Sequence, residues 1–311
     1  DSLFLYTLVL LVAIALVCMW GLLYPLASRA FTGTEITLDR GFYDRAVTPL
    51  LVMLVLLMAV CPLVGWSVAN LKKLGKRYII PLIVAVLATI AASIWLSKSW
   101  VALLSIFIVA LGLAVLTAVT ARDLSKVEKP LATFWKMRSR YGAFLVHTGI
   151  LLIMLGIVGV EGLSDSIQGT MVPGDKMPLG EYAVEYLELT ETYDSPEYLS
   201  VRAELDLWRG DEIIGRLTPG QDVYESRSQY VSIPGKRSTL AGDFYTIMLA
   251  YDSAMGYVSI QATINPLVNW MWIGSFLLCL GAAFSLSSPI VREQAFGNSD
   301  EREEDEELEA D

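Results

Sequence analysis

Six long stretches of this chain contain no charged side chain and consist mostly of apolar residues. A helix needs about twenty such residues to cross the hydrocarbon core of a bilayer. Because a backbone in lipid must satisfy its own hydrogen bonds, runs of this kind form helices. The sequence therefore predicts an α-helical membrane protein with six transmembrane helices, at Leu3–Tyr24, Ala46–Trp66, Tyr78–Trp95, Trp100–Val119, Tyr141–Val160 and Leu267–Leu286.

The segment 162–266, between the fifth and sixth runs, has a different pattern. Four of its stretches alternate apolar and polar residues, which is typical of half-buried strands. They are YAVEYLELTETY, YLSVRAELDLWRG, DFYTIMLAY and YVSIQATI, and the turn motifs RGD, TPG and IPG lie between them. We predict a small antiparallel β-domain, either a sandwich or a barrel, with a role in binding or positioning.

The distribution of basic residues predicts an orientation. Lysine and arginine collect in the loops Asn70–Tyr78 and Ala121–Arg140, whereas Ser97–Ser99 contains one lysine. The positive-inside rule then places both termini in the cytoplasm and the β-domain outside. The predicted parts are helices 1–5 with their loops (1–161), the extracytoplasmic β-domain (162–266), helix 6 (267–288) and a cytoplasmic tail (289–311).

The tail explains most of the formal net charge of -10. Residues 292–311 hold ten carboxylates against two arginines, and a block of like charges is typical of a disordered, solvated segment. Basic residues form no dense patch beside aromatic residues, so we expect no nucleic-acid partner. The three cysteines lie in apolar runs without C-x-x-C spacing, and we expect small buried hydrophobes there. A first-span proline, Pro25, is expected at a helix end.

His147 is the chain's one histidine, and it lies inside the fifth predicted span, about 10 Å along the helix from Arg140. An ionisable residue at that depth is a candidate functional residue. Gly142, Gly149 and Gly156 form a stripe suited to close helix packing, and His147 points away from it. Around His147 are Ala143, Phe144, Ile150, Leu151 and Met154, an apolar and aromatic surface that suits an axial ligand of a membrane haem.

Two other roles for His147 remain open at this stage. It fits a packing residue that hydrogen-bonds a neighbouring helix, which is common for a single membrane histidine. A proton relay is disfavoured, because the predicted spans contain no Asp, Glu, Lys or Arg to exchange a proton with.

Four stretches of the sequence resemble a known family. YGAFLVHTG (Tyr141–Gly149) resembles the family's Y-G-x-x-x-x-H-x-G segment. The stretch WGLLYPLASRAFTGTEITLDRGFYDRAVTPL resembles its G-T-L-Y-P-L region, and YESRSQYVSIPGKRSTLAGDFYTIML its outer-domain stretch. The most specific match is INPLVNWMWIGSFLLCLGA (Ile264–Ala282), which resembles the N-P-L-V-x-W-I-W-L-G start of the final span. The family is the CcmF, CycK and NrfE group of cytochrome c-type biogenesis proteins.

The resemblance implies haem handling in the cell inner membrane. CcmF-like proteins take haem from the chaperone CcmE and, with CcmH and CcmI, present it to the C-x-x-C-H thiols of apocytochrome c. They also hold a structural haem b between two histidines on different helices, and motif position makes His147 one of these ligands to the iron. Arg138 and Arg140, at the cytoplasmic edge of the same helix, are candidate contacts of the haem propionates, although a positive-inside role also explains them.

The chain departs from the family pattern in one respect. The WWD segment that cradles the delivered haem, the two histidines that flank it and the first membrane histidine belong to the family's N-terminal half, and none is in this sequence. We therefore expect part of a haem lyase, not competent alone, whose partners are the N-terminal CcmF portion, CcmE, CcmH, CcmI, apocytochrome c and membrane lipid. No catalytic residue is assigned. The alternatives are a non-catalytic scaffold whose β-domain recruits maturation partners, and the related lyase branch for nitrite-reductase cytochromes.

Overall fold

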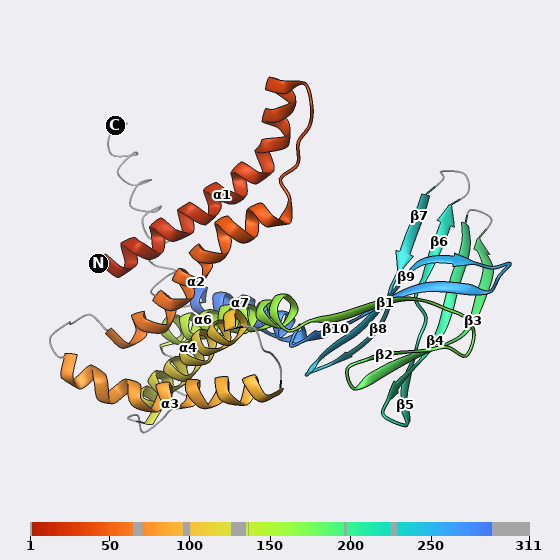
Figure 1. Cartoon of the computed structure of the whole chain (residues 1–311). Coiled ribbons are helices and arrows are strands. Elements are labelled where there is room, and N and C mark those ends of the chain that lie inside the picture. Colours follow the sequence, from red (N-terminus) through yellow and green to blue (C-terminus); the bar gives the residue numbers. More distant parts are fainter. Residues whose placement is uncertain are drawn as a thin grey trace, which may run out of the picture. The chain divides into compact units, whose positions relative to one another are not determined.

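A computed structural model describes residues 2–64, 71–95, 100–125, 135, 137–195, 198–224 and 229–287 (Figure 1). The chain divides into two compact units. One comprises Asp1–Met154 and Gly274–Asp311, and the other comprises Leu155–Ile273. The predicted acidic tail, 289–311, lies outside the described residues.

The predicted membrane helices are confirmed. Within the described part of the chain there are six long helices, α1 (Ser2–Thr32), α2 (Arg40–Val64), α3 (Leu71–Trp95), α4 (Trp100–Ser125), α6 (Arg138–Gly162) and α7 (Asn269–Leu286). Five contain stretches long and apolar enough to cross a membrane, while the apolar stretch described in α3, Ile79–Ile94, is shorter. Many of their large apolar side chains are exposed, as expected for surfaces that face lipid or other helices rather than water.

The first helix extends further than the sequence indicated. Pro25 lies inside α1 and does not end it, and the hydroxyl of Ser28 donates a hydrogen bond to the Pro25 carbonyl (3.0 Å). The helix ends instead at Gly33, which has a positive φ of 74°. The amide N–H of Gly33 donates a hydrogen bond to the Arg29 carbonyl (3.1 Å), so Gly33 forms a glycine cap. Asp39 then accepts a bond from the Phe42 amide (3.1 Å) and caps α2.

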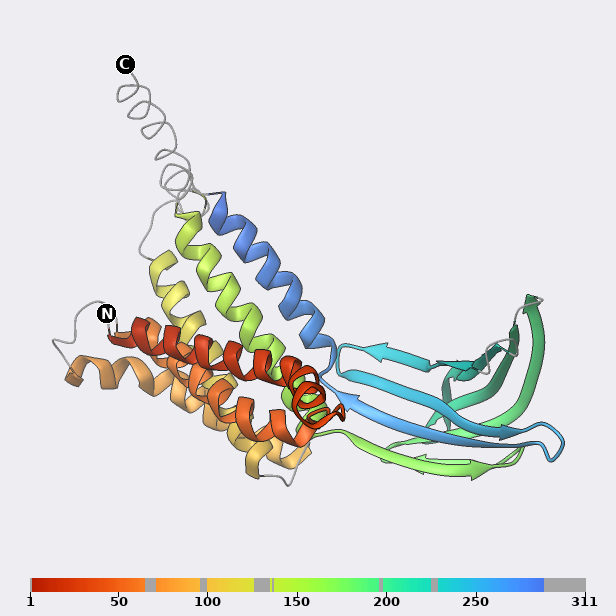
Figure 2. The same ribbon diagram turned by 90° about the horizontal axis from the view of Figure 1, so that it is seen from above.

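The glycine stripe predicted on α6 is confirmed as a packing surface. A Cβ atom placed at Gly142 would lie 2.7 Å from the Gly281 carbonyl of α7, and one at Gly149 would lie 2.6 Å from the Gly274 carbonyl. Gly281 and Gly274 meet α6 backbone equally closely. Figure 2 shows α6 (green) and α7 (blue) side by side along this glycine seam, which we define as these four residues together with Gly156 and Gly159.

The described residues of the second unit form ten antiparallel strands and confirm the predicted β-domain, which is a half-barrel of two sheets (Figure 1). The first sheet has the order β1-β10-β9-β8, and the second has the order β2-β3-β4-β6-β7 with β5 paired to β4. The strands are β1 (Asp165–Met171), β2 (Lys176–Leu179), β3 (Tyr182–Ser195), β4 (Tyr198–Arg209), β5 (Glu212–Leu217), β6 (Gly220–Tyr224), β7 (Gln229–Ile233), β8 (Gly235–Thr239), β9 (Gly242–Asp252) and β10 (Tyr257–Pro266).

Both sheets contribute to one hydrophobic core. Alternate residues of β4, Val201 to Leu207, are fully buried, and they pack with Met248 of β9 and Ile260 of β10. A β-bulge between β9 and β10 leaves two carbonyls turned inward there, and the buried side chain of Gln221 in β6 donates to both (Met248 O, 3.0 Å; Leu249 O, 3.4 Å). This amide joins the two sheets through a buried polar contact.

The helix ends in the second unit lead directly into paired strands. Asp165, three residues beyond α6, pairs with Ile264, close to the start of α7. Asn269, the first residue of α7, donates from its side chain to Thr239 O and to Asp243 Oδ1, both at 2.6 Å. Between them, Leu267 adopts a left-handed φ of 61°, which is rare for a branched residue and marks a tightly determined turn.

We predict that Gly149→Ala lowers the unfolding temperature of the detergent-solubilised chain. The added methyl group would meet the backbone of α7, which cannot move aside as a flexible side chain does, and overpacking of this kind costs about 1–3 kcal/mol. Gly41→Ala is the matched control, because its nearest contacts are side-chain atoms at 3.4 Å or more. Equal unfolding temperatures for the two variants would show that the seam does not depend on glycine.

We also predict that Gln221→Leu destabilises the β-domain by about 1–3 kcal/mol, because the buried carbonyl of Met248 and the partly buried carbonyl of Leu249 lose their donor. Hydrogen exchange of the β9 and β10 amides measures the effect. Gln229→Leu removes the same amide from an exposed position on β7 and should leave exchange unchanged. Unchanged protection in the Gln221 variant would contradict the role of this amide.

Candidate functional site

His147 lies in the first half of α6 and is half-buried. Its Nδ1 atom is 2.6 Å from the carbonyl oxygen of Ala143, one turn earlier in the same helix. Because a carbonyl can only accept, Nδ1 must carry the proton of this hydrogen bond. In the neutral tautomer that this bond selects, Nε2 carries the lone pair, and Nε2 has no hydrogen-bond partner among the described residues.

This arrangement has the form of a metal-ligand histidine. Such residues usually donate their second ring N–H to a carbonyl or carboxylate, which fixes the tautomer and the ring orientation. Here a backbone carbonyl of α6 has that role. The bond lies within one helix, and the part of the chain that the structure describes offers no cross-helix partner for this imidazole.

The face of α6 that carries His147 is the one that α7 does not cover. At 100° per residue, His147 lies about 140–160° around the helix from Gly142 and Gly149. Of the surrounding apolar residues predicted from the sequence, Leu151 is buried, while Ala143, Phe144, Ile150 and Met154 are partly exposed. An apolar surface is thus available on this side for another helix or a planar apolar group.

The two arginines at the start of α6 both have partners. Arg138 Nε donates to the carbonyl of Ser287 at the end of α7 (3.0 Å), and its guanidinium lies 5.9 Å from the Trp135 ring centre. Arg140 pairs with Asp123 of α4 at 2.6 Å and lies 5.9 Å from the Phe144 ring centre. These contacts position the first turn of α6 and leave both guanidiniums partly exposed.

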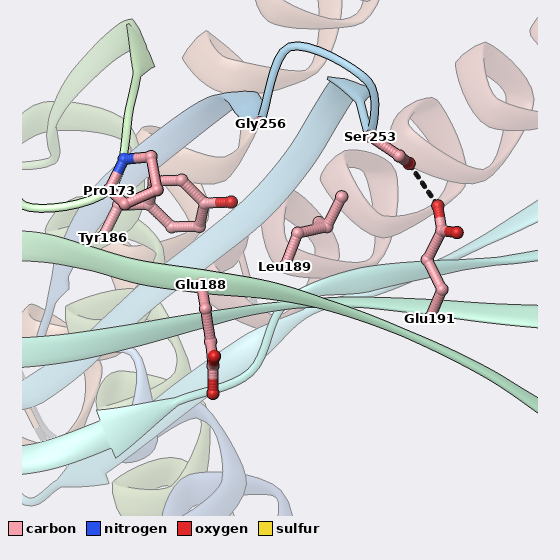
Figure 3. Close-up of a pocket in the computed structure, with 7 residues that line it drawn as sticks. All are labelled: Pro173, Tyr186, Glu188, Leu189, Glu191, Ser253 and Gly256. Atoms are coloured by element: carbon pink, nitrogen blue, oxygen red, sulfur yellow. Dashed lines mark hydrogen bonds between the residues drawn. The ribbon is translucent and has the colours of Figure 1, made fainter.

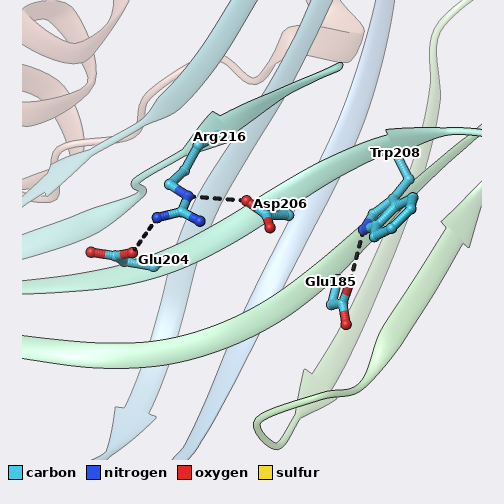
Figure 4. A network of polar contacts seen from close by, with 5 residues as sticks. All are labelled: Glu185, Glu204, Asp206, Trp208 and Arg216. Carbon is cyan, nitrogen blue, oxygen red and sulfur yellow. Dashed lines mark hydrogen bonds and ion pairs between the residues drawn. The ribbon is translucent and has the colours of Figure 1, made fainter. Parts of the chain in front are cut away.

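The β-domain carries its own polar networks, and two of them lie on strands of the second sheet. Arg216 of β5 bridges Asp206 (3.0 Å) and Glu204 (3.1 Å), and the hydrogen bond to Asp206 raises the pKa of Arg216 (Figure 4). The indole of Trp208 donates to Glu185 (2.8 Å). Arginine–carboxylate pairs at the edge of a sheet tie strands together and supply no acid–base chemistry, so we read these networks as structural.

Neither a metal site nor a disulfide emerges from the described residues. No group of three or more His, Cys, Asp and Glu residues comes together there. Cys18 and Cys279 are free, and both are exposed, which differs from the burial expected from their apolar surroundings; the side chain of Cys61 is outside the described set. They face outward because apolar residues of membrane helices also cover surfaces directed at lipid.

Sequence reasoning missed one feature of the β-domain. Tyr186 is fully buried, yet its hydroxyl has no hydrogen-bond partner in the described structure, and it borders a pocket that also includes Glu191. The only sequence signal was an aromatic residue at an inward position of a strand, which ordinarily means core packing.

Comparison with known proteins gives a consistent result. No family model matches the chain. The chain is 27% identical to the cytochrome c-type biogenesis protein CcmF of Escherichia coli K12, over 94% of this chain and 44% of the relative. It is 26% identical to CcmF of Pseudomonas aeruginosa, over 85% of this chain and 40% of the relative. It is 29% identical to the probable NrfE of E. coli K12, over 50% of this chain and 28% of the relative.

A solved structure supports the fold. The chain superposes on a structure described as cytochrome c haem lyase CcmF with a TM-score of 0.74, at 20% identity, covering 92% of this chain and 46% of that one. The chain thus spans less than half the length of the relatives it matches. It is a multi-pass membrane homologue of the CcmF, CycK and NrfE family of cytochrome c-type biogenesis proteins and corresponds to a portion of CcmF.

Proposed function

We propose that this chain is a component of a cytochrome c haem lyase, in which His147 is one axial ligand of a membrane haem b. The observation that carries the proposal is the hydrogen bond from Nδ1 to Ala143 O, which leaves Nε2 as a lone-pair donor. Haem b, when bound, would supply one-electron redox chemistry. The chain's own contribution is to orient the imidazole and to offer apolar residues to the macrocycle.

The chain contains one histidine, so a second imidazole ligand has to come from another polypeptide portion. We assign that role to the N-terminal CcmF portion that carries the WWD segment. The proposed reaction is transfer of haem from CcmE to apocytochrome c with CcmH and CcmI, and this chain does not perform it alone. The relatives of this chain are cytochrome c-type biogenesis proteins, which supports a role in this reaction.

The β-domain is proposed to lie on the outer side of the inner membrane and to help dock CcmE or CcmH and CcmI, with both termini in the cytoplasm. Its lack of His and Cys, together with its structural ion pairs, fits docking better than catalysis. The similarity to CcmF covers nearly the whole chain and the similarity to NrfE half of it, which favours general maturation over the nitrite-reductase branch.

We predict that His147→Ala abolishes a low-spin b-type spectrum in the chain co-purified with its N-terminal portion, because the axial nitrogen is lost. The absorption spectrum and a pyridine haemochrome assay measure this. Thr148→Ala is the matched control, since it removes a neighbouring polar group that donates only to Phe144 O (2.9 Å).

A variant that fails to fold would mimic loss of a ligand, so His147→Gly with added imidazole separates the two. Recovery of the spectrum with imidazole identifies position 147 as an axial site. Equal haem content in wild type and His147→Ala, or none in either, would return His147 to packing and favour the scaffold alternative.

The proposed propionate contacts of Arg138 and Arg140 are tested by a double alanine variant. We expect reduced haem loading, because two cations near the cytoplasmic edge are removed. Asp123→Ala is the control, since it breaks the pair with Arg140 while keeping both arginines. Normal loading in the arginine variant would leave the two residues with a purely structural and orienting role.

A further inference from the structure

A pocket of about 320 Å³ opens in the β-domain, between β3 and the turn that joins β9 to β10 (Figure 3). Its volume is at the lower end of the range for ligand sites, and it suits one long side chain rather than a cofactor. Residues of β3, the β1–β2 turn and the β9–β10 turn line it: Pro173, Tyr186, Glu188, Leu189, Glu191, Ser253 and Gly256.

The Tyr186 hydroxyl is the feature of the pocket that packing does not explain. The side chain is 0% exposed, and its hydroxyl oxygen has no hydrogen-bond partner within the described residues. Buried polar groups almost always have partners, so an orphaned one at a pocket wall indicates a missing ligand atom. In Figure 3 the hydroxyl points from β3 toward the space beside Leu189, and burial, with a further effect of Glu188, raises the pKa of this phenol.

Glu191 supplies negative charge at the other side of the pocket. One of its carboxylate oxygens accepts a hydrogen bond from Ser253 in the β9–β10 turn, which holds the side chain against that turn, and the other has no described partner (Figure 3). Glu188 lies at the rim with its carboxylate directed away. The whole segment 162–266 contains 16 Asp and Glu residues against 7 Lys and Arg, so the surrounding field is also negative.

We propose that this pocket binds a lysine or arginine side chain of a partner polypeptide. Leu189 would contact the aliphatic stem, and the free oxygen of Glu191 would accept a hydrogen bond from the charged head. The Tyr186 hydroxyl, on the other side of Leu189, would bond a polar group of the same partner segment. An anionic ligand would be repelled by Glu191, and a purely apolar one would leave Tyr186 unsatisfied. The proposal rests on the docking role of the β-domain and does not depend on haem binding at His147.

The test uses the full chain in detergent, labelled with 3-fluorotyrosine, and fluorine NMR. The resonance that disappears in Tyr186→Phe is that of Tyr186. The probe is the capped tripeptide acetyl-Ala-Arg-Ala-amide, and the same peptide with citrulline in place of arginine is the neutral control. We expect a saturable shift of the Tyr186 resonance with the arginine peptide and none with the citrulline peptide.

Two variants of equal charge change sharpen the result. Glu191→Gln should weaken binding about tenfold, as expected for loss of a charge-assisted hydrogen bond, whereas Glu212→Gln on β5 should leave it unchanged. Tyr186→Phe should unfold at the same or a higher temperature, because it removes an unpaired hydroxyl. Three outcomes would overturn the proposal. One is that neither peptide shifts the resonance, in which case an ordered water would satisfy the hydroxyl. The others are that the citrulline peptide binds as well as the arginine peptide, or that the two glutamate variants weaken binding equally.

Discussion

The close approach of α6 and α7 is the constraint on which the rest of this structure depends. Glycines at 142 and 149 on α6 meet glycines at 281 and 274 on α7 so closely that a single methyl group would collide with backbone. Within the second unit, Gly156 lies close to Met271 and Gly159 lies close to Pro266. Helices this close can deliver the chain into adjacent antiparallel strands, and β1 and β10 pair immediately beyond them. The seam therefore determines how a β-domain can be inserted between two membrane helices.

The same seam determines which face of α6 remains for chemistry. Because α7 occupies the glycine side, His147 is left on the opposite side of the helix, among apolar residues. The free-energy cost of placing an imidazole there is reduced by the Ala143 carbonyl, which accepts a hydrogen bond from Nδ1–H. This bond lies within α6 and does not require a polar residue from a neighbouring helix. Packing against α7 and the ligation proposed for His147 thus involve different faces of one helix and do not compete for the same residues.

The elements of this fold were predictable because their signals are local. Uncharged apolar runs predicted the helices, and the alternation of apolar and polar residues predicted strands β3, β4, β9 and β10. A seven-residue glycine repeat predicted the face of α6 that α7 covers. The position of Pro25 was predicted wrongly because a membrane helix tolerates an internal proline, although the proline has no N–H to donate to the carbonyl of Gly21 one turn earlier. The other described strands were missed, since they hold four to seven residues each and an alternation that short is hard to recognise; they are β1, β2, β5, β6, β7 and β8.

Non-local features were beyond any sequence pattern. The pocket at Tyr186 forms where β3 meets the β9–β10 turn, more than sixty positions further along the chain, and only the paired sheets bring them together. His147 could be singled out from the sequence because it is unique and lies in an apolar run, but its tautomer required the Ala143 contact. The two candidate sites also rely on different physics. The ligand proposed at position 147 relies on a nitrogen lone pair in apolar surroundings, where a charge would be expensive, whereas the site proposed in the β-domain relies on a carboxylate in a negative field to select a cation. Because the first requires an apolar environment and the second a charged one, the two proposed functions require different residues, and these belong to different units of the chain.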